Sequence, residues 1–263
     1  MVSGFAMACM AATLALCIAL PGVGMWILSR RARGVWRAFL AGAVAFFLSQ
    51  IVLRLPMMSL ATAFAPDTAG AFLTRPVVAS FSAGLFEETA RLVFMLLMLR
   101  GTRRLIDGLA FGLGHGGLEA ILLVGMSIVN NLVIAVMINA GQWDSFAKTM
   151  PPEVASKVYS ALVDTAPADF LAGGVERVWA IGLHIACSLI ILMGIERDQR
   201  IVAWVVAVLV HGFTNLGLVT AIQHGINPWF AELGGFLAVA VLLTVVVWRA
   251  RLIFDSQMSP QGA

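Results

Sequence analysis

The stretch FSAGLFEETARLVFMLLML, from Phe81 to Leu99, decides how this chain must fold. It is long and apolar enough for a membrane-spanning helix, yet Glu87 and Glu88 stand side by side within it. A charge at the bilayer centre costs about 2.5–3.5 kcal/mol even on the lower insertion scales, so an ionisable group there indicates a functional site. Arg91 follows one helical turn after Glu87 and can share its face. The stretch therefore predicts a buried polar site inside a membrane protein.

The composition extends this prediction to the whole chain. Of its 263 residues, 60% are hydrophobic and 12% are charged, whereas a soluble domain carries about 25% charged residues. Each spanning helix needs about 20 apolar residues. We predict an all-α, polytopic transmembrane helix bundle with about seven spans, at roughly 3–28, 38–62, 77–99, 105–130, 169–194, 201–222 and 229–248. Long apolar runs without alternation, such as 233–247, argue against a transmembrane β-barrel.

The distribution of Lys and Arg predicts the orientation of the bundle. With the N-terminus outside and the C-terminus cytoplasmic, eleven basic residues fall in cytoplasmic stretches and three in outer loops. The cytoplasmic ones are Arg30, Arg31, Arg33, Arg37, Arg100, Arg103, Arg104, Arg197, Arg200, Arg249 and Arg251. The formal charge of +3 thus reflects topology. We expect the lipid bilayer, and no nucleic acid, as a partner.

We predict a single integral membrane domain over residues 1–263, without an internal repeat. Its long polar connection, 141–168, is expected on the outer side, with a short amphipathic helix from Pro152 to about Val163. This helix is interpreted as interfacial, and a lid over the site is the alternative. The segment 105–140 is longer than a bilayer requires, so it either projects or breaks, most naturally at Asn130 and Asn131.

Further polar side chains occur in the other predicted spans. They are His115 with Glu119, Glu176 with Arg177, His184, and His211 with Asn215. At about 1.5 Å per residue from the cytoplasmic end of each span, the glutamate pair and these three histidines all lie roughly 15–20 Å deep. Residues four apart also share a helix face. We therefore predict that four spans bring carboxylates and imidazoles to one level in the membrane.

Such a group of residues suits hydrolysis of an amide bond. Glu87 or Glu88 can form a general-base pair with His115 around one water molecule. His211 and Asn215 can supply donors that stabilise an oxyanion. Which of the two glutamates is the base stays open at this point.

A metal-dependent site is the alternative from the same residues. His115, His184 and His211 together with a carboxylate can bind Zn²⁺, which then activates the water. Glu119 is expected to orient His115 or to add a ligand. Four other polar residues within the spans are interpreted as packing or charge-balancing groups: Gln50, Arg54, Glu176 and Arg177.

Three motifs, in order, resemble those of the CAAX-protease and bacteriocin-processing superfamily of intramembrane proteases. They are Glu87-Glu88-x-x-Arg91, Phe111-x-x-x-His115 and His211-x-x-x-Asn215. Within this superfamily the chain resembles the YhfC family of intramembrane metalloproteases. Two further stretches are similar to that family: the run GLGHGGLEA at 112–120, and Gln50 with Arg54-Leu55-Pro56. The likeness extends from about the second predicted span to the sixth.

The resemblance implies an intramembrane endopeptidase, in the cell membrane as a multi-pass protein of the bacterial inner membrane. Its substrate would be a membrane protein or membrane-associated peptide. The first-motif glutamates and His115 would activate the water, Arg91 would balance charge, and His211 with Asn215 would support the oxyanion. Type II CAAX endopeptidases carry EExxxR, one residue more than this chain, so a prenylated substrate is not implied.

Two other classes of protein compete with this interpretation. A proton-coupled membrane transporter also uses intramembrane Glu, His and Arg. A transport pathway, however, would need polar groups along the whole thickness of the membrane, and here the polar groups are expected at one level. A non-catalytic membrane scaffold of the same fold is the other alternative, since one fold can serve several functions.

Overall fold

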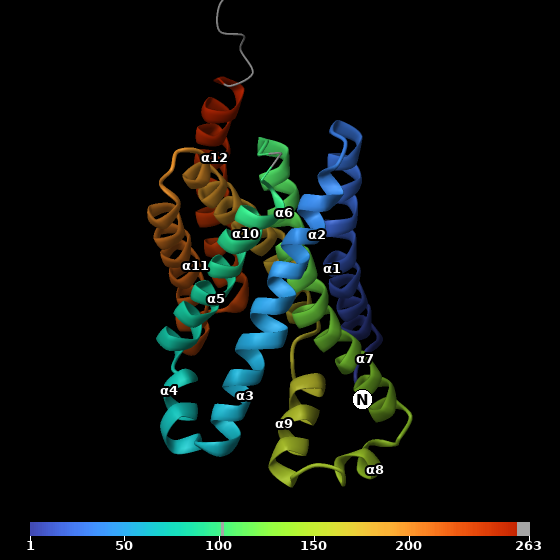
Figure 1. Cartoon of the computed structure of the whole chain (residues 1–263). Coiled ribbons are helices and arrows are strands. Elements are labelled where there is room, and N and C mark those ends of the chain that lie inside the picture. The colour runs from blue at the N-terminus through green and yellow to red at the C-terminus, as the bar shows by residue number, and fades with distance from the viewer. Residues whose placement is uncertain (101–102, 257–263) are drawn as a thin grey trace, which may run out of the picture.

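The structure, a computed structural model that describes residues 1–100 and 103–256, is a bundle of long helices (Figure 1). All regular elements of the described chain are helical. In chain order they are α1 (Gly4–Arg31), α2 (Val35–Phe46), η1 (Phe47–Arg54), α3 (Leu55–Phe64), η2 (Pro66–Gly70), α4 (Ala71–Leu73), α5 (Pro76–Met98), α6 (Leu105–Glu119), η3 (Ala120–Gly125), α7 (Met126–Asn139), α8 (Trp143–Ala147), α9 (Pro152–Val163), η4 (Pro167–Leu171), α10 (Ala172–Glu196), α11 (Arg200–Gln223) and α12 (Pro228–Ser256).

The predicted transmembrane architecture is confirmed. In the described chain six helical stretches are long and apolar enough to cross a membrane: Gly4–Arg31, Val35–Phe64, Leu105–Asn139, Pro167–Glu196, Arg200–Gln223 and Pro228–Phe254. A seventh candidate is a bent pair, in which Pro66–Leu73 meets Pro76–Met98 at 65°. The straight part of this pair is α5, and Glu87 lies at its midpoint.

The ends of the bundle differ in the elements that they carry (Figure 1). The turn from α1 to α2, the start of α6, the turn from α10 to α11 and the end of α12 lie at one end. These are the places to which the sequence assigns its cytoplasmic arginines. The elements α3, α4, α8 and α9 lie at the other end. Such segregation is what the positive-inside rule requires.

Glycines allow the four helices of the predicted site to pack closely. A Cβ atom added at Gly116 of α6 would lie 2.8 Å from His184 Cδ2 and 3.1 Å from Ile181 Cα on α10. A Cβ atom at Gly84 of α5 would lie 3.0 Å from the Val208 carbonyl oxygen on α11. Small residues permit such approach in a membrane, where helix association depends on packing rather than on a hydrophobic force. Close packing brings the polar residues of α5, α6, α10 and α11 within reach of one another.

Two of the six unbroken membrane-crossing stretches contain a π-helical segment, and a third such segment, η2, lies in the bent pair. η1 joins α2 to α3, and η3 joins α6 to α7. The long segment does not break at Asn130 and Asn131, which lie inside α7; its irregular turn is η3 instead. π segments are rare and occur frequently at functional sites. Both adjoin the polar residues considered below, because Gln50 and Arg54 belong to η1 and Glu119 directly precedes η3.

The polar connection after α7 contains α9, over the residues expected to form an amphipathic helix. Its Leu162 is buried in a small apolar cluster with residues of α1 and α7, among them Met10 and Ile138. This contact places α9 beside α1 and α7.

Candidate functional site

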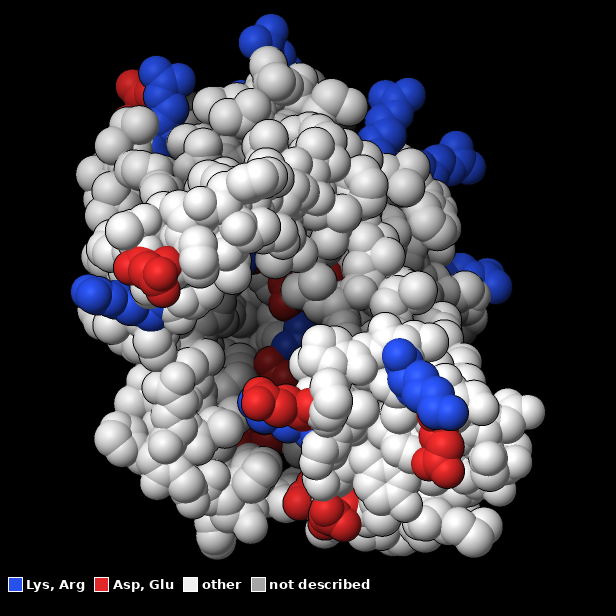
Figure 2. Space-filling view, turned by 90° about the horizontal axis from the view of Figure 1, so that it is seen from below, with Lys and Arg blue, Asp and Glu red and all other residues white. Residues whose placement is uncertain are grey.

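Polar side chains from five helical elements line one cavity in the middle of the bundle, with a volume of about 330 Å³. Its polar lining is Gln50, Arg54, Ser80, Glu87, Glu119, Glu176, Arg177, His184, His211 and Asn215. Seen from the end that carries α3, α4, α8 and α9, the molecule is hollowed, and acidic and basic side chains lie inside the hollow (Figure 2). The four helices predicted to bring carboxylates and imidazoles to one level all contribute to this lining.

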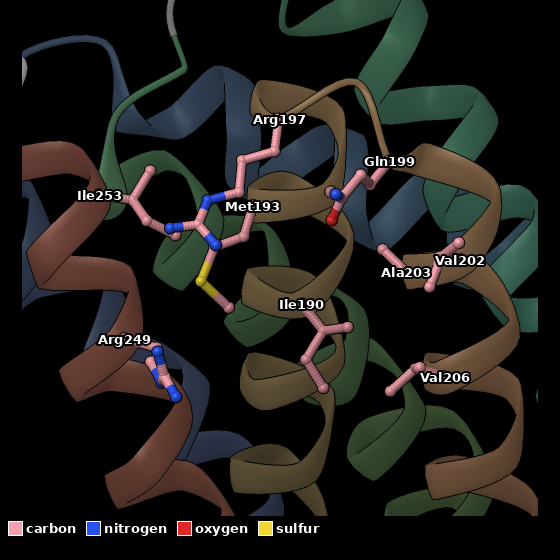
Figure 3. A pocket seen from close by; sticks show the side chains of 10 residues that line it. Ile190, Met193, Arg197, Gln199, Val202, Ala203, Val206, Arg249 and Ile253 are labelled. Carbon is pink, nitrogen blue, oxygen red and sulfur yellow. The ribbon is translucent and has the colours of Figure 1, made fainter.

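A second cavity, of about 400 Å³, lies between α10, α11 and α12 near the turn from α10 to α11. Figure 3 shows aliphatic side chains around it, together with Arg197, Gln199 and Arg249. The described lining of this cavity includes no carboxylate and no imidazole. Because hydrolysis needs a group that can take a proton at neutral pH, the central cavity is the candidate site.

Glu87 is the carboxylate on which the helices converge. Its Oε1 accepts a hydrogen bond from Gln50 Nε2 at 2.6 Å. Its Oε2 lies 2.9 Å from His115 Nε2. The same oxygen is 3.8 Å from His184 Nδ1 and 3.9 Å from His211 Nε2. These partners come from η1, α6, α10 and α11, and none of them is an arginine.

Glu88 is enclosed in a buried ion pair instead. Arg91 donates from Nε to Glu88 Oε2 at 2.7 Å and from Nη2 to Oε1 at 3.2 Å. His211 Nδ1 lies 2.9 Å from the same Oε1. Arg91 Nη1 also donates to Ser188 Oγ at 2.5 Å and to the His184 carbonyl oxygen at 3.1 Å. Arg91, expected to share a face with Glu87, thus pairs with Glu88, three residues away.

The hydrogen-bond partners assign the tautomers of two imidazoles. An ionised carboxylate only accepts hydrogen bonds, so His211 Nδ1 donates to Glu88, and in the neutral ring the lone pair is then on Nε2. A guanidinium only donates, so His184 Nδ1, 3.0 Å from Arg91 Nη2, keeps its lone pair. These two nitrogens are the ones that His184 and His211 direct towards Glu87 Oε2, at 3.8 Å and 3.9 Å.

Glu119, expected to orient His115 or to add a metal ligand, contacts residues of α10. Its Oε2 lies 2.6 Å from His184 Nε2, without the alignment of a hydrogen bond, and its Oε1 accepts from Arg177 Nη1 at 2.8 Å. Arg177 also pairs with Glu176. His115 Nδ1 has no hydrogen-bond partner within the described chain, so no contact supports the expected orientation of His115 by Glu119. The charge of Arg177 draws the carboxylate towards α10, although helical spacing puts it on the face of His115.

Three ligand-type side chains are close enough to share a metal ion. One atom each of Glu87, His184 and His211 lies within 4.8 Å of the other two, and all three residues are buried. One carboxylate and two imidazoles form a donor set of catalytic zinc sites. In the neutral ring His211 Nε2 offers the lone pair that a metal ligand needs, whereas the lone pair of His184 Nδ1 accepts from Arg91 Nη2 in this structure and would turn from Arg91 to the metal on binding. The residues therefore fit a zinc ion. His115 was expected as a third imidazole ligand, and it instead contacts Glu87.

The remaining predicted residues divide between the cavity wall and the layer behind it. Asn215 lines the cavity beside His211, as Glu87, Glu119 and His184 do. Glu88, Arg91 and His115 are fully buried behind that wall. Four residues interpreted as packing groups also line the cavity: Gln50, Arg54, Glu176 and Arg177. Their polarity inside apolar spans was the signal that could have included them.

The chain is similar to one described family of membrane proteins. The model of a family described as "YhfC intramembrane metalloprotease" matches residues 16–234, which include every residue of the site. The chain is 32% identical over 175 residues to the "Uncharacterized membrane protein YhfC" of Bacillus subtilis (strain 168), a match that covers 66% of this chain and 67% of that protein. No solved structure matches the chain. The extent of the family match, over the helices that hold the buried Glu-His-His group, shows that the chain belongs to the YhfC intramembrane metalloprotease family.

Proposed function

We propose that this protein is an intramembrane endopeptidase that hydrolyses a peptide bond within or beside the bilayer. The observation that carries the proposal is the convergence of Glu87, His184 and His211 within 4.8 Å, in a cavity enclosed by membrane-crossing helices. Ionisable groups in the middle of spans are expensive to keep there. Their meeting around one cavity, together with the description of the family, supports a catalytic use.

Zinc is the metal that we propose for the site, held by Glu87, His184 and His211. When bound, it would supply an activated water and polarise the scissile carbonyl group. Glu88 holds the ring of His211 through Nδ1, which is the support that metal-ligating imidazoles usually have. Glu87 Oε2 lies 2.9 Å from His115 Nε2, so with Glu87 as a ligand of zinc, His115 is the member of this pair that can hold the proton taken from the water and deliver it to the leaving amine.

Asn215 is the proposed donor to the oxyanion. It lines the cavity on α11, one helical turn after His211. A side-chain amide at this place can donate a hydrogen bond to the oxygen on which negative charge develops. Removing one such donor costs about 10²–10³ in kcat in a well-studied protease, and we expect Asn215→Ala to lower the cleavage rate on that scale without changing zinc affinity.

We propose that the substrate is a membrane protein segment or a membrane-associated peptide. The cavity is enclosed by spans and is visible from the end opposite the arginine-bearing turns (Figure 2). The positive-inside rule makes that end the outer one, in the membrane of a bacterial cell. The order of the three motifs supports placing the family in the CAAX-protease and bacteriocin-processing superfamily.

The proposal is tested on the purified full-length protein in lipid nanodiscs. Elemental analysis should find zinc, and a pool of membrane-segment peptides should be cleaved, with the cleavage lost on chelation and restored by added zinc. A folded, zinc-supplied protein that leaves every peptide intact would overturn the proposal. Proton-coupled solute flux in liposomes would then favour the transporter, and the lack of both activities would favour the scaffold.

A further inference from the structure

Glu87 is held by a second group of residues besides the histidines. Gln50 of η1 is buried, and its Nε2 donates to Glu87 Oε1 at 2.6 Å. Arg54 Nη1 donates to Gln50 Oε1 at 3.0 Å. Since a guanidinium has no acceptor atom, the amide oxygen of Gln50 must face Arg54 and its nitrogen must face Glu87. The hydrogen-bond donor to Glu87 therefore has one orientation.

Arg54 is itself anchored to the helix that carries Glu87. Its Nε donates to Ser82 Oγ at 3.1 Å, and its Nη2 donates to the Ala79 carbonyl oxygen at 2.7 Å. Both acceptors belong to α5. Arg54 is only 8% exposed, and among the described residues no carboxylate forms an ion pair with it. A buried charge without an ion pair is costly in a membrane, so its retention requires a reason beyond packing.

The backbone of η1 is irregular at the same place. Leu55 N–H bonds to the Gln50 carbonyl oxygen, five residues back, which is the π-helical pattern. Such turns are usually single and are enriched at functional sites. The irregular turn thus coincides with the two residues that reach Glu87.

We infer that Gln50 and Arg54 are positioning residues for the reaction, an inference that rests on the proposed function. By holding Glu87 Oε1, they leave Oε2 to face His115, His184 and His211. Ligating carboxylates in metalloproteins are commonly held by such partners, and removal of a partner costs about 10–100-fold in metal affinity or activity.

The test is Gln50→Met in the full-length protein in nanodiscs, because Met keeps the length of the side chain and removes the donor. Zinc affinity, measured by competition with a chelator, should fall about 10–100-fold. The kcat for peptide cleavage should fall with it, while KM should change little because Gln50 acts through Glu87. The matched control is Ser49→Ala, since Ser49 is equally buried in η1 and its Oγ bonds to the Phe46 carbonyl oxygen. That variant should keep wild-type zinc affinity.

Two milder variants keep the inference testable if Gln50→Met does not fold. Arg54→Lys retains the charge and one donor, and Ser82→Ala removes one anchor of Arg54. Both variants should weaken zinc binding. The loss in each should be smaller than in Arg54→Met, which removes the charge and all the donors of Arg54. Folded variants with wild-type zinc affinity and kcat would overturn the positioning role and leave the proposed function intact. A folded wild type that neither holds zinc nor cleaves peptides would overturn the proposed function itself.

Discussion

Glu87 and Glu88 are neighbours in the chain, but their surroundings are unlike. Glu88 is fully buried and bonded twice by Arg91. Glu87 lines the cavity, and its closest partners are the amide of Gln50 and the ring of His115. Successive residues of an α-helix point about 100° apart, since one turn takes 3.6 residues. One carboxylate therefore points into the packed interior and holds the site together, while the other is available for chemistry.

The largest effect is expected for Glu87→Gln, which keeps the shape of the side chain and removes its charge. Glu87 is a proposed zinc ligand and the partner of His115. Loss of a general acid–base group alone lowers rates by about 10²–10⁴, so we expect the rate of peptide cleavage to fall towards the upper end of that range. The free energy of unfolding should fall less than in Arg91→Met, because among the described residues no arginine forms an ion pair with Glu87. Glu153→Gln on the exposed side of α9 is the matched control and should leave the rate unchanged. Comparable activity in Glu87→Gln and wild type would remove the distinction between the two glutamates.

Arg91→Met should act on stability. It leaves the carboxylate of Glu88 buried without its cation, and breaking a buried ion pair in this way costs about 3–5 kcal/mol. The free energy of unfolding, measured with a denaturant in one fixed micelle composition, should fall by that amount. The double variant Glu88→Gln/Arg91→Met should recover much of the loss, because neither charge remains. If Arg91→Met alone costs less than about 1 kcal/mol, Glu88 is not the structural partner described here.

His184→Ala and His211→Ala should weaken zinc binding, measured by chelator competition at matched protein concentration. Removal of a partner behind a ligand costs about 10–100-fold in affinity, so removal of a ligand itself should cost at least the upper value. His224→Ala is the control, because His224 is exposed after the end of α11. Equal zinc affinity in all three variants would assign the metal to other residues.

Ser188→Ala should have the smallest effect of these variants. It should lower the free energy of unfolding without changing zinc affinity, which separates the structural role of the Glu88 side from the metal-binding role of the Glu87 side. Ser188 Oγ accepts a hydrogen bond from Arg91, and hydrogen bonds to charged groups contribute about 1.5–3 kcal/mol. We expect a loss near the lower value, since Arg91 keeps its bonds to Glu88. Zinc affinity should stay at the wild-type level. A large loss of zinc with normal stability would link Ser188 to the Glu87 side of the site.

The spans and most of the site were predictable because both follow from local properties of the chain. Apolar length marks a membrane helix, and polar residues within it stand out against that background. The predicted span 77–99 and α5, Pro76–Met98, differ by one residue at each end. Equal depth along the spans correctly associated His115, His184 and His211 with the glutamate pair.

Other features depended on contacts between helices. The partner of Glu119 is an example, since helical spacing pairs it with His115 while Arg177 of α10 draws it to His184. Gln50 is another, because its polarity was visible in the sequence but its bond to Glu87 joins residues 37 positions apart. The position of the π turns was equally invisible, and the sequence instead suggested Asn130 and Asn131 as the irregular point.

The sequence by itself determined that this is a bundle of membrane helices with carboxylates and imidazoles at mid-depth, because the cost of burying charge in lipid acts on each span separately. Only the tertiary structure decided which glutamate meets Arg91 and which meets the cavity. The rotation of each helix about its own axis decides which side chain faces the cavity. That rotation depends on close helix packing at residues such as Gly84 and Gly116. Glu87 and Glu88 are chemically identical, so only their surroundings in the bundle make one structural and the other available to a substrate.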